Sequence, residues 1–293
     1  MRVRKAVIPA AGLGTRLLPA SKSVPKEMIP LVDRPAIQYV VEECVRAGIR
    51  DVLIVTGRGK ATMEDHFDRS LELEERLEKS GKAEELEEVR RVASMADVHY
   101  VRQKEALGLG HAVGTARAHV GDEPFAVLLP DEIVPAPIRA EPPLLERMME
   151  VHEREGASVV AVRRVPHDRV SAYGIVAPEG DLVDDFVKVI DLVEKPAVAD
   201  APSDLGAVGR YILGPEVFDA IDATTPGAGG EIQLTDGIRA LVGSPGVYAY
   251  LHRGPIYDVG KRLDYVKGTL QLALRRDDVG PPLKAWLREL LEG

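Results

Sequence analysis

The sequence predicts an α/β fold in which a mostly parallel sheet is covered by helices on both faces. Short apolar runs alternate with helical patterns along the chain, an order typical of parallel strands joined by crossover helices. The chain has 293 residues, which is enough to bury a large core. Because no internal repeat or low-complexity linker interrupts the pattern, we expect one domain over residues 1–293.

The expected strands are short apolar segments bounded by turn-forming residues. In chain order they are Ala6–Ile8, Asp51–Thr56, Val98–Arg102, Phe125–Leu129, Ser158–Arg163, Gly174–Ala177, Val187–Val193, Ala207–Leu213 and Val247–Leu251. After Gly156 the pattern becomes irregular and glycine and proline separate the strands. We expect that second half to complete the sheet.

A well-marked helix is predicted between the first two strands, with Pro35 near its start and Gly48 placed to end it. Apolar residues recur at the helical spacing of i, i+3, i+4, i+7 and i+8. These residues are Ile37, Val40, Val41, Cys44 and Val45. Cys44, the only cysteine, is therefore expected to be a packed thiol rather than a reactive one.

Two further helical regions look like additions to this core. Residues 60–97 form an expected insertion of helices broken near Ser80, and between Glu64 and Asp97 it carries 12 acidic and 6 basic residues. We expect a solvated, charged face there. The second region is a C-terminal helical tail, residues 262–293, which is amphipathic and contains the only tryptophan, Trp286. The pattern leaves open whether this tail packs on the core or forms a subunit interface.

Composition excludes several classes of protein. The formal charge is −9, from 38 Lys+Arg and 47 Asp+Glu, so no nucleic-acid surface is expected. A single cysteine excludes an intrachain disulfide framework and a cysteine-based metal site. The N-terminal apolar run ends at Pro9 and no long apolar span follows, so we expect a cytoplasmic protein with no membrane segment.

The first predicted strand ends in a glycine turn followed by cations. Gly12 and Gly14 allow backbone N–H groups to approach a ligand closely, and Arg16, Lys22 and Lys26 follow. Backbone amides can cradle phosphate oxygens while fixed cations offset their charge. We interpret this segment as a triphosphate site.

Other interpretations of this glycine turn fit its residues less well. A dinucleotide-binding turn has the pattern G-x-G-x-x-G and opens a helix, but here Leu17 takes the third glycine position and Pro19 and Pro25 prevent a long helix. The P-loop pattern is absent. A purely structural glycine turn would not need three cations close behind it.

Carboxylates end two other apolar strands. Asp131 and Glu132 follow AVLLP, and Asp258 follows PIY. Hard oxygen ligands beside a triphosphate indicate Mg²⁺, with waters and substrate oxygens completing its octahedron. The alternative for Asp131 alone is an ordinary residue in a turn at the end of a strand.

The segment AAGLGTRLLPASKSVPKEMIPLVDRPAIQYVVEE resembles the opening of bacterial UTP–glucose-1-phosphate uridylyltransferases, members of the sugar-nucleotide pyrophosphorylases. The likeness runs from Lys5 to about Gly268. It implies a Rossmann-like nucleotidyltransferase domain with a mixed, mostly parallel central sheet flanked by helices, followed by the helical tail. A segment like GRGKATMEDHFDRSLELEERL distinguishes this branch from shorter thymidylyltransferases. We expect a homo-oligomer, a dimer or a tetramer.

The resemblance implies a role for each matching residue. The nucleotide would contact the first turn and a second glycine loop, at Ala11, Gly12, Gly14, Thr15, Gln103 and Gly108. The sugar phosphate would contact Gly174, Glu194 and Lys195. Arg16, Lys26 and Lys195 would supply catalytic charge, and Asp131 and Asp258 would bind the metal. The residue after the first aspartate varies among relatives, so Glu132 is not assigned as a ligand. GRYIL and GEIQLTD, which starts at Gly230, would wall the sugar pocket.

The reaction implied is attack of a glucose 1-phosphate oxygen on the α-phosphorus of UTP, which gives UDP-glucose and pyrophosphate. The attacking phosphate is already an anion, so the enzyme needs charge compensation and alignment rather than a general base. Two alternatives remain open from the sequence. The chain could prefer dTTP or another sugar phosphate, or it could be a catalytically silent sensor of sugar nucleotides.

Overall fold

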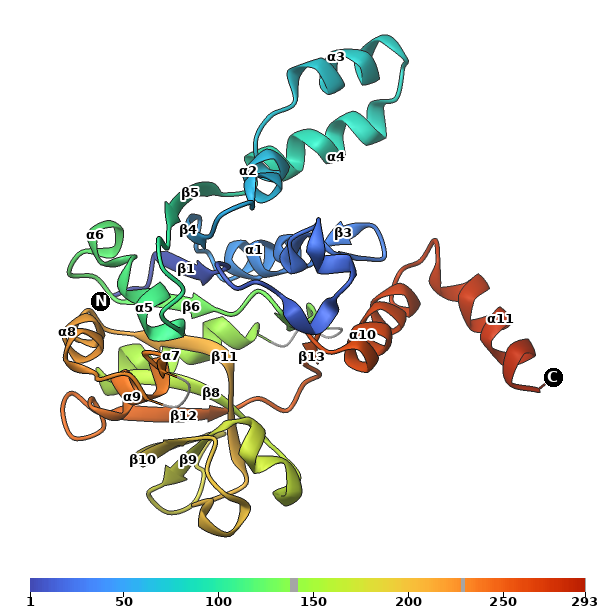
Figure 1. Ribbon diagram of the computed structural model, residues 1–293. Helices are drawn as coiled ribbons and strands as arrows, with labels where there is room; N and C mark the ends of the chain where they lie inside the picture. Colours follow the sequence, from blue (N-terminus) through green and yellow to red (C-terminus); the bar gives the residue numbers. More distant parts are fainter. Residues whose placement is uncertain (138–141, 228–229, 293) are drawn as a thin grey trace.

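A nine-stranded mixed sheet forms the centre of the molecule in the computed structural model, which describes residues 1–137, 142–227 and 230–292 (Figure 1). The strands lie in the order β5 (Asp97–Arg102), β4 (Asp51–Thr56), β1 (Lys5–Pro9), β6 (Phe125–Leu128), β11 (Leu205–Leu213), β8 (Ser158–Arg164), β12 (Val247–Leu251), β10 (Phe186–Glu194) and β9 (Gly174–Pro178). Each strand expected from the sequence is present, with bounds shifted by two residues at most.

The expectation of a mostly parallel sheet is wrong. Four strand pairs are parallel, namely β5–β4, β4–β1, β1–β6 and β8–β12. Five pairs are antiparallel, and β11 takes part in three of them, with β6, β8 and β9. Parallel neighbours need a crossover, usually helical, whereas antiparallel neighbours can be joined by short turns. Between β8 and β11 the chain has strands, turns and two 3-10 helices, so its strands pair mainly antiparallel.

The helices cover both faces of the sheet, as expected. They are α1 (Ala36–Arg46), α2 (Ala61–Phe67), α3 (Leu71–Lys79), α4 (Ala83–Ser94), α5 (Leu109–Gly114), α6 (Arg117–Val120), α7 (Leu144–Glu155), α8 (Glu216–Ala223), α9 (Leu234–Arg239), α10 (Arg262–Leu274) and α11 (Gly280–Glu292). Short 3-10 helices complete the elements of the described residues: η1 (Thr15–Leu17), η2 (Ala20–Lys22), η3 (Lys26–Met28), η4 (His167–Ala172) and η5 (Val198–Asp200).

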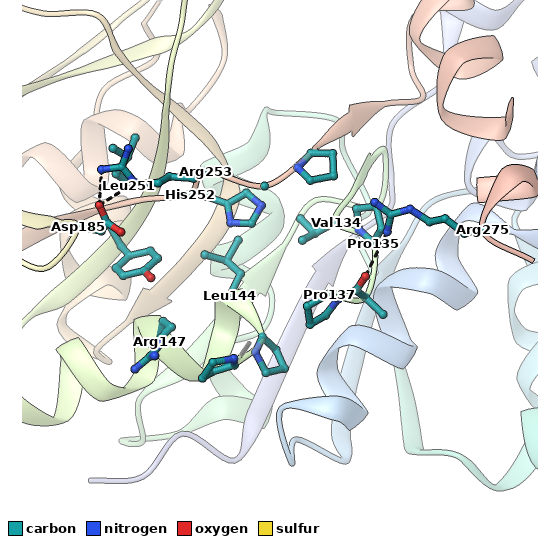
Figure 2. A pocket seen from close by; sticks show the side chains of 16 residues that line it. Val134, Pro135, Pro137, Leu144, Arg147, Asp185, Leu251, His252, Arg253 and Arg275 are labelled. Carbon is teal, nitrogen blue, oxygen red and sulfur yellow. Dashed lines mark hydrogen bonds and ion pairs between the residues drawn. The ribbon is translucent and has the colours of Figure 1, made fainter. Parts of the chain in front are cut away.

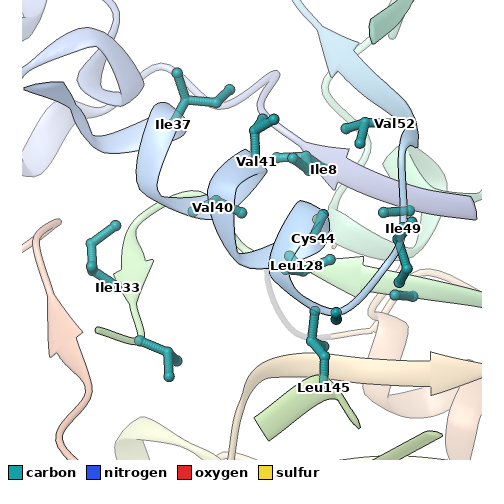
Figure 3. Close-up of a cluster of buried hydrophobic side chains, with 14 of the residues drawn as sticks. Ile8, Ile37, Val40, Val41, Cys44, Ile49, Val52, Leu128, Ile133 and Leu145 are labelled. Carbon is teal, nitrogen blue, oxygen red and sulfur yellow. The ribbon is translucent and has the colours of Figure 1, made fainter. Parts of the chain in front are cut away.

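Two hydrophobic cores lie on opposite faces of the sheet. Along β1 the side chains of Ala6 and Ile8 enter one core and that of Val7 enters the other, as the alternation of a strand requires. The first core packs α1 and α7 on the sheet. Cys44, on the inner face of α1, is fully buried in this core (Figure 3). The second core packs α5, α6, α8 and α9 on the other face. The expectation of a packed Cys44 thiol is confirmed.

Two small sheets position loops at one edge of the main sheet. β13 (Tyr257–Asp258) pairs antiparallel with β7 (Glu132–Ile133), which places Asp258 opposite Glu132. β2 (Pro30–Leu31) pairs with β3 (Arg34–Pro35) just before α1. Strands β2 and β3 follow the chain that leaves the carboxyl end of β1, where the glycine turn lies. Strand β7 follows the carboxyl end of β6, next to Asp131.

The helical insertion and the helical tail project from the body of the molecule (Figure 1). In α3 and α4 most side chains are exposed, and the break between them falls at residues 80–82, as expected. In α11 the apolar side chains of Trp286, Leu290 and Leu291 are also exposed. Within the described residues, none of the helices combines the length and apolar character that crossing a bilayer requires.

Candidate active site

The glycine turn after β1 is held in a conformation that depends on glycine. Gly14 has φ 67°, and a Cβ built there would lie 3.0 Å from the Cβ of Lys26, so a side chain at this position would be strained and crowded. An added Cβ at Gly12 would meet nothing within 4 Å. Thr15 and Arg16 follow in η1, and neither is buried. The turn is therefore packed on Lys26 on one side and open on the other.

Lys26 and Asp131 form an ion pair. Lys26 Nζ lies 2.6 Å from Asp131 Oδ2. Burial alone would lower the pKa of Lys26, but the Asp131 carboxylate outweighs burial and the pKa is raised. Burial alone would raise the pKa of Asp131, but Lys26 outweighs it and the pKa is lowered. Arg16 is near enough to lower the pKa of both groups. Both members of the pair are thus held in their charged forms.

Asp131 and Asp258 converge on Gly260. A Cβ built on Gly260 would lie 3.2 Å from Asp131 Oδ2 and 3.1 Å from Asp258 Oδ1. The backbone fixes this arrangement, because Val259 donates its N–H to the carbonyl of Asp131 at 2.8 Å. Asp258 Oδ2 also pairs with Lys261 Nζ at 2.7 Å. The structure therefore brings together two carboxylates that lie far apart in the sequence.

Glu132 accepts a hydrogen bond from the central sheet and lies near Asp131 and Asp258. Its Oε2 accepts the backbone N–H of Gly209 in β11 at 3.1 Å. Burial raises the pKa of Glu132 to about 7, and both carboxylates are near enough to contribute to that rise. Sequence reasoning missed the group that holds this region, the buried pair of Arg210 and Glu43. Arg210 donates to the Glu43 carboxylate and to the carbonyls of Leu129 and Glu132. The available signal was an arginine inside the apolar strand LGAVGRYIL.

The second glycine loop carries Gln103 in a buried position. Its Nε2 lies 3.2 Å from the carbonyl of Gly108 and 2.8 Å from Nδ1 of His111. Gly108 has φ 106°, and a Cβ there would lie 2.6 Å from the carbonyl oxygen of Ile232. Only glycine fits this approach. The loop at residues 103–111 is thus pinned against residues 231–233.

The sugar-side residues of the sequence prediction also meet. Lys195 has φ 46°, which ends β10 and lets its Nζ reach Glu194 Oε1 at 2.9 Å. Glu194 Oε2 accepts the hydroxyl of Thr235 at 2.7 Å. A Cβ on Gly174 would lie 3.2 Å from that carboxylate oxygen. Strand β10 ends at Glu194, and the backbone turns at Lys195. The two neighbouring side chains therefore do not point to opposite faces, as they would in a strand, and can form an ion pair.

The GEIQLTD segment contacts both the loop that follows Gln103 and the side chain of Glu194. Ile232 accepts the N–H of Gly110 at 2.8 Å and donates its own N–H to the carbonyl of Leu107 at 2.8 Å, while Thr235 bonds to Glu194. The family resemblance implies that this segment walls the sugar pocket, which stays a prediction. Its contact with the Gln103 loop is an addition that the sequence did not predict.

Two cavities lie near this region. One of about 970 Å³ is lined by Tyr173, Asp258 and Lys261, so it adjoins the carboxylates. The other, of about 620 Å³, is lined by prolines and by Arg147, His252 and Arg275, and Arg253 pairs with Asp185 at one end (Figure 2). Among the described residues that line this second cavity, none is a predicted site residue.

Comparison with known proteins identifies the family of this chain. A family model described as nucleotidyl transferase matches residues 5–274. A UTP–glucose-1-phosphate uridylyltransferase of Bacillus subtilis (strain 168) is 49% identical over 293 residues, covering 99% of this chain and 98% of the relative. A relative of the same name from Streptococcus pneumoniae is 48% identical, covering 99% and 96%.

Solved structures are similar over nearly the whole chain. A UTP-bound UGPase from Acinetobacter baumannii has a TM-score of 0.91 and 42% identity, covering 98% of this chain and 99% of that one. A UDP-glucose pyrophosphorylase complexed with UDP-glucose has a TM-score of 0.85 and 39% identity, covering 94% and 100%. With a family match over residues 5–274 and relatives close to half identical, this chain belongs to the nucleotidyl transferase family.

Proposed function

We propose that this chain transfers the uridylyl group of UTP to glucose 1-phosphate, forming UDP-glucose and pyrophosphate. The observation that carries the proposal is the convergence of Lys26, Asp131 and Asp258 beside the glycine turn. The relatives named as uridylyltransferases, and the similar structures that hold UTP or UDP-glucose, support the choice of substrates.

UTP would occupy the two glycine loops. The backbone of Ala11, Gly12, Gly14 and Thr15 would approach the base and phosphates, with Gln103 and the Gly108 backbone at the uracil edge. An amide can both donate and accept, as the edge of uracil requires. The buried position of Gln103 and its bonds to Gly108 and His111 support a fixed orientation for that amide.

Glucose 1-phosphate would occupy the other end. Glu194 would accept hydrogen bonds from the glucose hydroxyls, with the Gly174 backbone beside it, and Lys195 would bind the sugar's phosphate. The contact between Glu194 and Thr235 supports this role, because it orients the carboxylate while its other oxygen pairs with Lys195.

The reaction would be a direct displacement at the α-phosphorus. The attacking phosphate oxygen is already anionic, so the chain has to align two anions and offset the charge of the α-phosphate and the leaving pyrophosphate. Arg16, Lys26 and Lys195 would supply that charge. Lys26 is held in its charged form by Asp131, which fits a role in electrostatic stabilisation rather than proton transfer.

Mg²⁺ is the metal that the donor set favours. Asp131 and Asp258 offer hard carboxylate oxygens around one point, and such oxygens with waters and phosphates suit Mg²⁺. When bound, the ion would offset negative charge on the phosphates. Glu132 is engaged with Gly209, so we leave it out of the metal site.

An assay of substrates tests the proposal against its alternatives. Pyrophosphate release would be measured with UTP, dTTP, ATP and GTP, each combined with several sugar 1-phosphates. We expect the highest kcat/KM for UTP with glucose 1-phosphate. A higher kcat/KM for dTTP or another sugar phosphate would assign a different member of the family, and no release from any pair would indicate a sensor.

We also propose a homo-oligomer, a dimer or a tetramer, with the tail at the interface. The exposure of Trp286, Leu290 and Leu291 on α11 supports this, because an apolar helix face gains stability when it is covered. Light scattering coupled to size exclusion should give a mass of at least two chains. Replacing Trp286 and Leu290 with Glu should reduce that mass to one chain, and an unchanged mass would move the interface elsewhere.

A further inference from the structure

A buried ion pair lies beside the backbone that leads into the glycine turn. Lys60, the residue before α2, is 7% exposed, and Glu27, the neighbour of Lys26, is 1% exposed. Lys60 Nζ lies 2.8 Å from Glu27 Oε2 and also donates to the carbonyl of Ala10, the residue that follows β1. One ammonium group therefore joins three separate segments of the chain.

Stability alone does not explain this pair. A buried ion pair gains little over apolar residues of the same volume, because both charges lose their hydration. The pair is also incompletely satisfied, since Glu27 Oε1 is buried and has no hydrogen-bond partner among the residues that the structure describes. Buried polar groups left in that state call for another explanation.

The bonds of Lys60 converge on the backbone that leads into the nucleotide loop. Ala10 donates its N–H to the carbonyl of Val55 at 2.8 Å, and its carbonyl accepts from Lys60. Next to it, a Cβ on Gly57 would lie 2.9 Å from the carbonyl oxygen of Ala11. The segment at residues 57–60 therefore lies along the start of the glycine turn. Through Glu27, the same ammonium fixes the backbone beside Lys26.

We propose that Lys60 is a positioning residue for UTP, which sets the glycine turn and the Lys26 backbone in register without touching the substrate. The proposal rests on the proposed assignment of that turn to the nucleotide. It also gives the helical insertion a link to the active site, because Lys60 is its first residue. The sugar end lies outside these contacts, so its affinity should not depend on them.

The test compares Lys60→Met, Glu27→Leu and the double variant with Lys79→Met, which removes an exposed lysine of the same insertion. For each, UTP binding by calorimetry, the KM for each substrate and the midpoint of thermal unfolding are measured. Lys60→Met should weaken UTP binding at least about fivefold and leave the KM for glucose 1-phosphate within about twofold. Lys79→Met should match the parent chain.

The double variant separates positioning from stability. With both charges removed, the unfolding midpoint should recover towards that of the parent chain, while UTP binding stays weak. If the double variant recovered UTP binding as well as the unfolding midpoint, the proposal would be overturned and the pair would have a structural role only. Gln103→Ala serves as the reference for the nucleotide site: if it weakens UTP binding and Lys60→Met does not, Lys60 has no positioning role. If Gln103→Ala leaves UTP binding unchanged, the nucleotide assignment fails, and the inference fails with it.

A second, independent feature is a cluster of one aspartate and two histidines near the start of strand β4, away from the glycine turn. Asp51 begins β4, His99 lies in β5 and His119 lies in α6. Asp51 Oδ1 is 2.7 Å from Nε2 of His119 and 3.8 Å from Nε2 of His99. One potential ligand atom from each residue lies within 4.8 Å of the other two. Both imidazoles thus converge on one carboxylate oxygen.

We infer that these three side chains form a site for a transition-metal cation of the zinc type. Two imidazole nitrogens and a carboxylate are a ligand set that suits Zn²⁺, with water in the fourth position. Ligand bonds of about 2.0–2.2 Å require ligand atoms about 3.3 Å apart, so the partly exposed side chains, whose ligand atoms lie up to 4.8 Å apart, would have to approach one another by up to about 1.5 Å. Lys5 is close but bonds to the carbonyls of His119 and Val120 and to Glu123.

Calorimetric titration with Zn²⁺ tests this site, in excess Mg²⁺ so that the hard-oxygen site is filled. We expect one Zn²⁺ per chain, with affinity reduced at least about tenfold in His99→Ala and in His119→Ala. His167→Ala, which removes an exposed histidine elsewhere, should bind like the parent chain. No Zn²⁺ binding, or binding that both substitutions leave unchanged, would overturn the inference.

Discussion

Arg210 belongs to the GRYIL segment that the resemblance assigns to the wall of the sugar pocket, but its side chain is fully buried, and we expect it to be one of the most important residues for stability. Its guanidinium is fully buried and donates to both oxygens of Glu43 at 2.8–3.1 Å. It also donates to the carbonyls of Leu129, Gly209 and Glu132 at 3.2, 2.8 and 2.6 Å. The substitution Arg210→Met would keep a long apolar side chain but remove every one of these bonds.

The expected loss of folding free energy in Arg210→Met comes from the Glu43 carboxylate, which stays buried without its partner. Removing one partner of a buried ion pair costs about 3–5 kcal/mol, because the other charge stays buried. For a chain of this size each kcal/mol lowers the unfolding midpoint by about 2–4 °C, so the loss is about 6–20 °C. The further substitution Glu43→Leu should restore part of it.

Calorimetry and circular dichroism of Arg210→Met, Glu43→Leu and the double variant measure this cycle. The matched control is Arg239→Met, which removes an exposed arginine that pairs with Asp191. This control should lower the midpoint by less than about 4 °C, because exposed ion pairs contribute at most about 1 kcal/mol. A midpoint in Arg210→Met within that same range would refute the reasoning.

Three further outcomes follow from the site. Lys26→Ala should lower kcat at least about 100-fold, as loss of one strong electrostatic donor does; near-normal kcat at saturating substrates would remove Lys26 from the mechanism. Asp131→Asn and Asp258→Asn should each raise the Mg²⁺ needed for activity, and full activity in EDTA would contradict the metal site. Gly209→Ala should destabilise the chain by about 1–3 kcal/mol, because its Cβ would lie 2.5 Å from Leu129; urea unfolding checks this.

Local patterns in the sequence carried most of the element predictions. Apolar runs located the strands, and the helical spacing around Cys44 located α1 with its buried face. The direction of the strands could not be read in the same way. Alternating elements predicted parallel pairing, but β11 returns through the centre of the sheet and pairs antiparallel with three strands. That pairing depends on contacts between distant segments, which no local pattern reports.

In the candidate site, too, some residues could be predicted from local sequence patterns and others depend on contacts between distant segments. Glycine turns and strand-end carboxylates are local signals, and they led to Gly14, Gly108 and Asp131. The groups that support them are not local. Arg210 pairs with Glu43 across 167 positions, and Lys60 pairs with Glu27 across 33. A charged residue inside an apolar segment shows that a partner is needed, but only the fold identifies that partner.

We propose that the nucleotide binds at Gln103 and the sugar at Glu194, so that each residue governs the affinity for a different substrate. Steady-state kinetics of Gln103→Ala and Glu194→Ala, with both substrates varied, test it most directly. Gln103→Ala should raise chiefly the KM for UTP, and Glu194→Ala chiefly that for glucose 1-phosphate, each by roughly five- to a hundredfold, because each loses hydrogen bonds to a buried partner. Equal shifts of both constants in both variants, or the reverse pattern, would contradict the account.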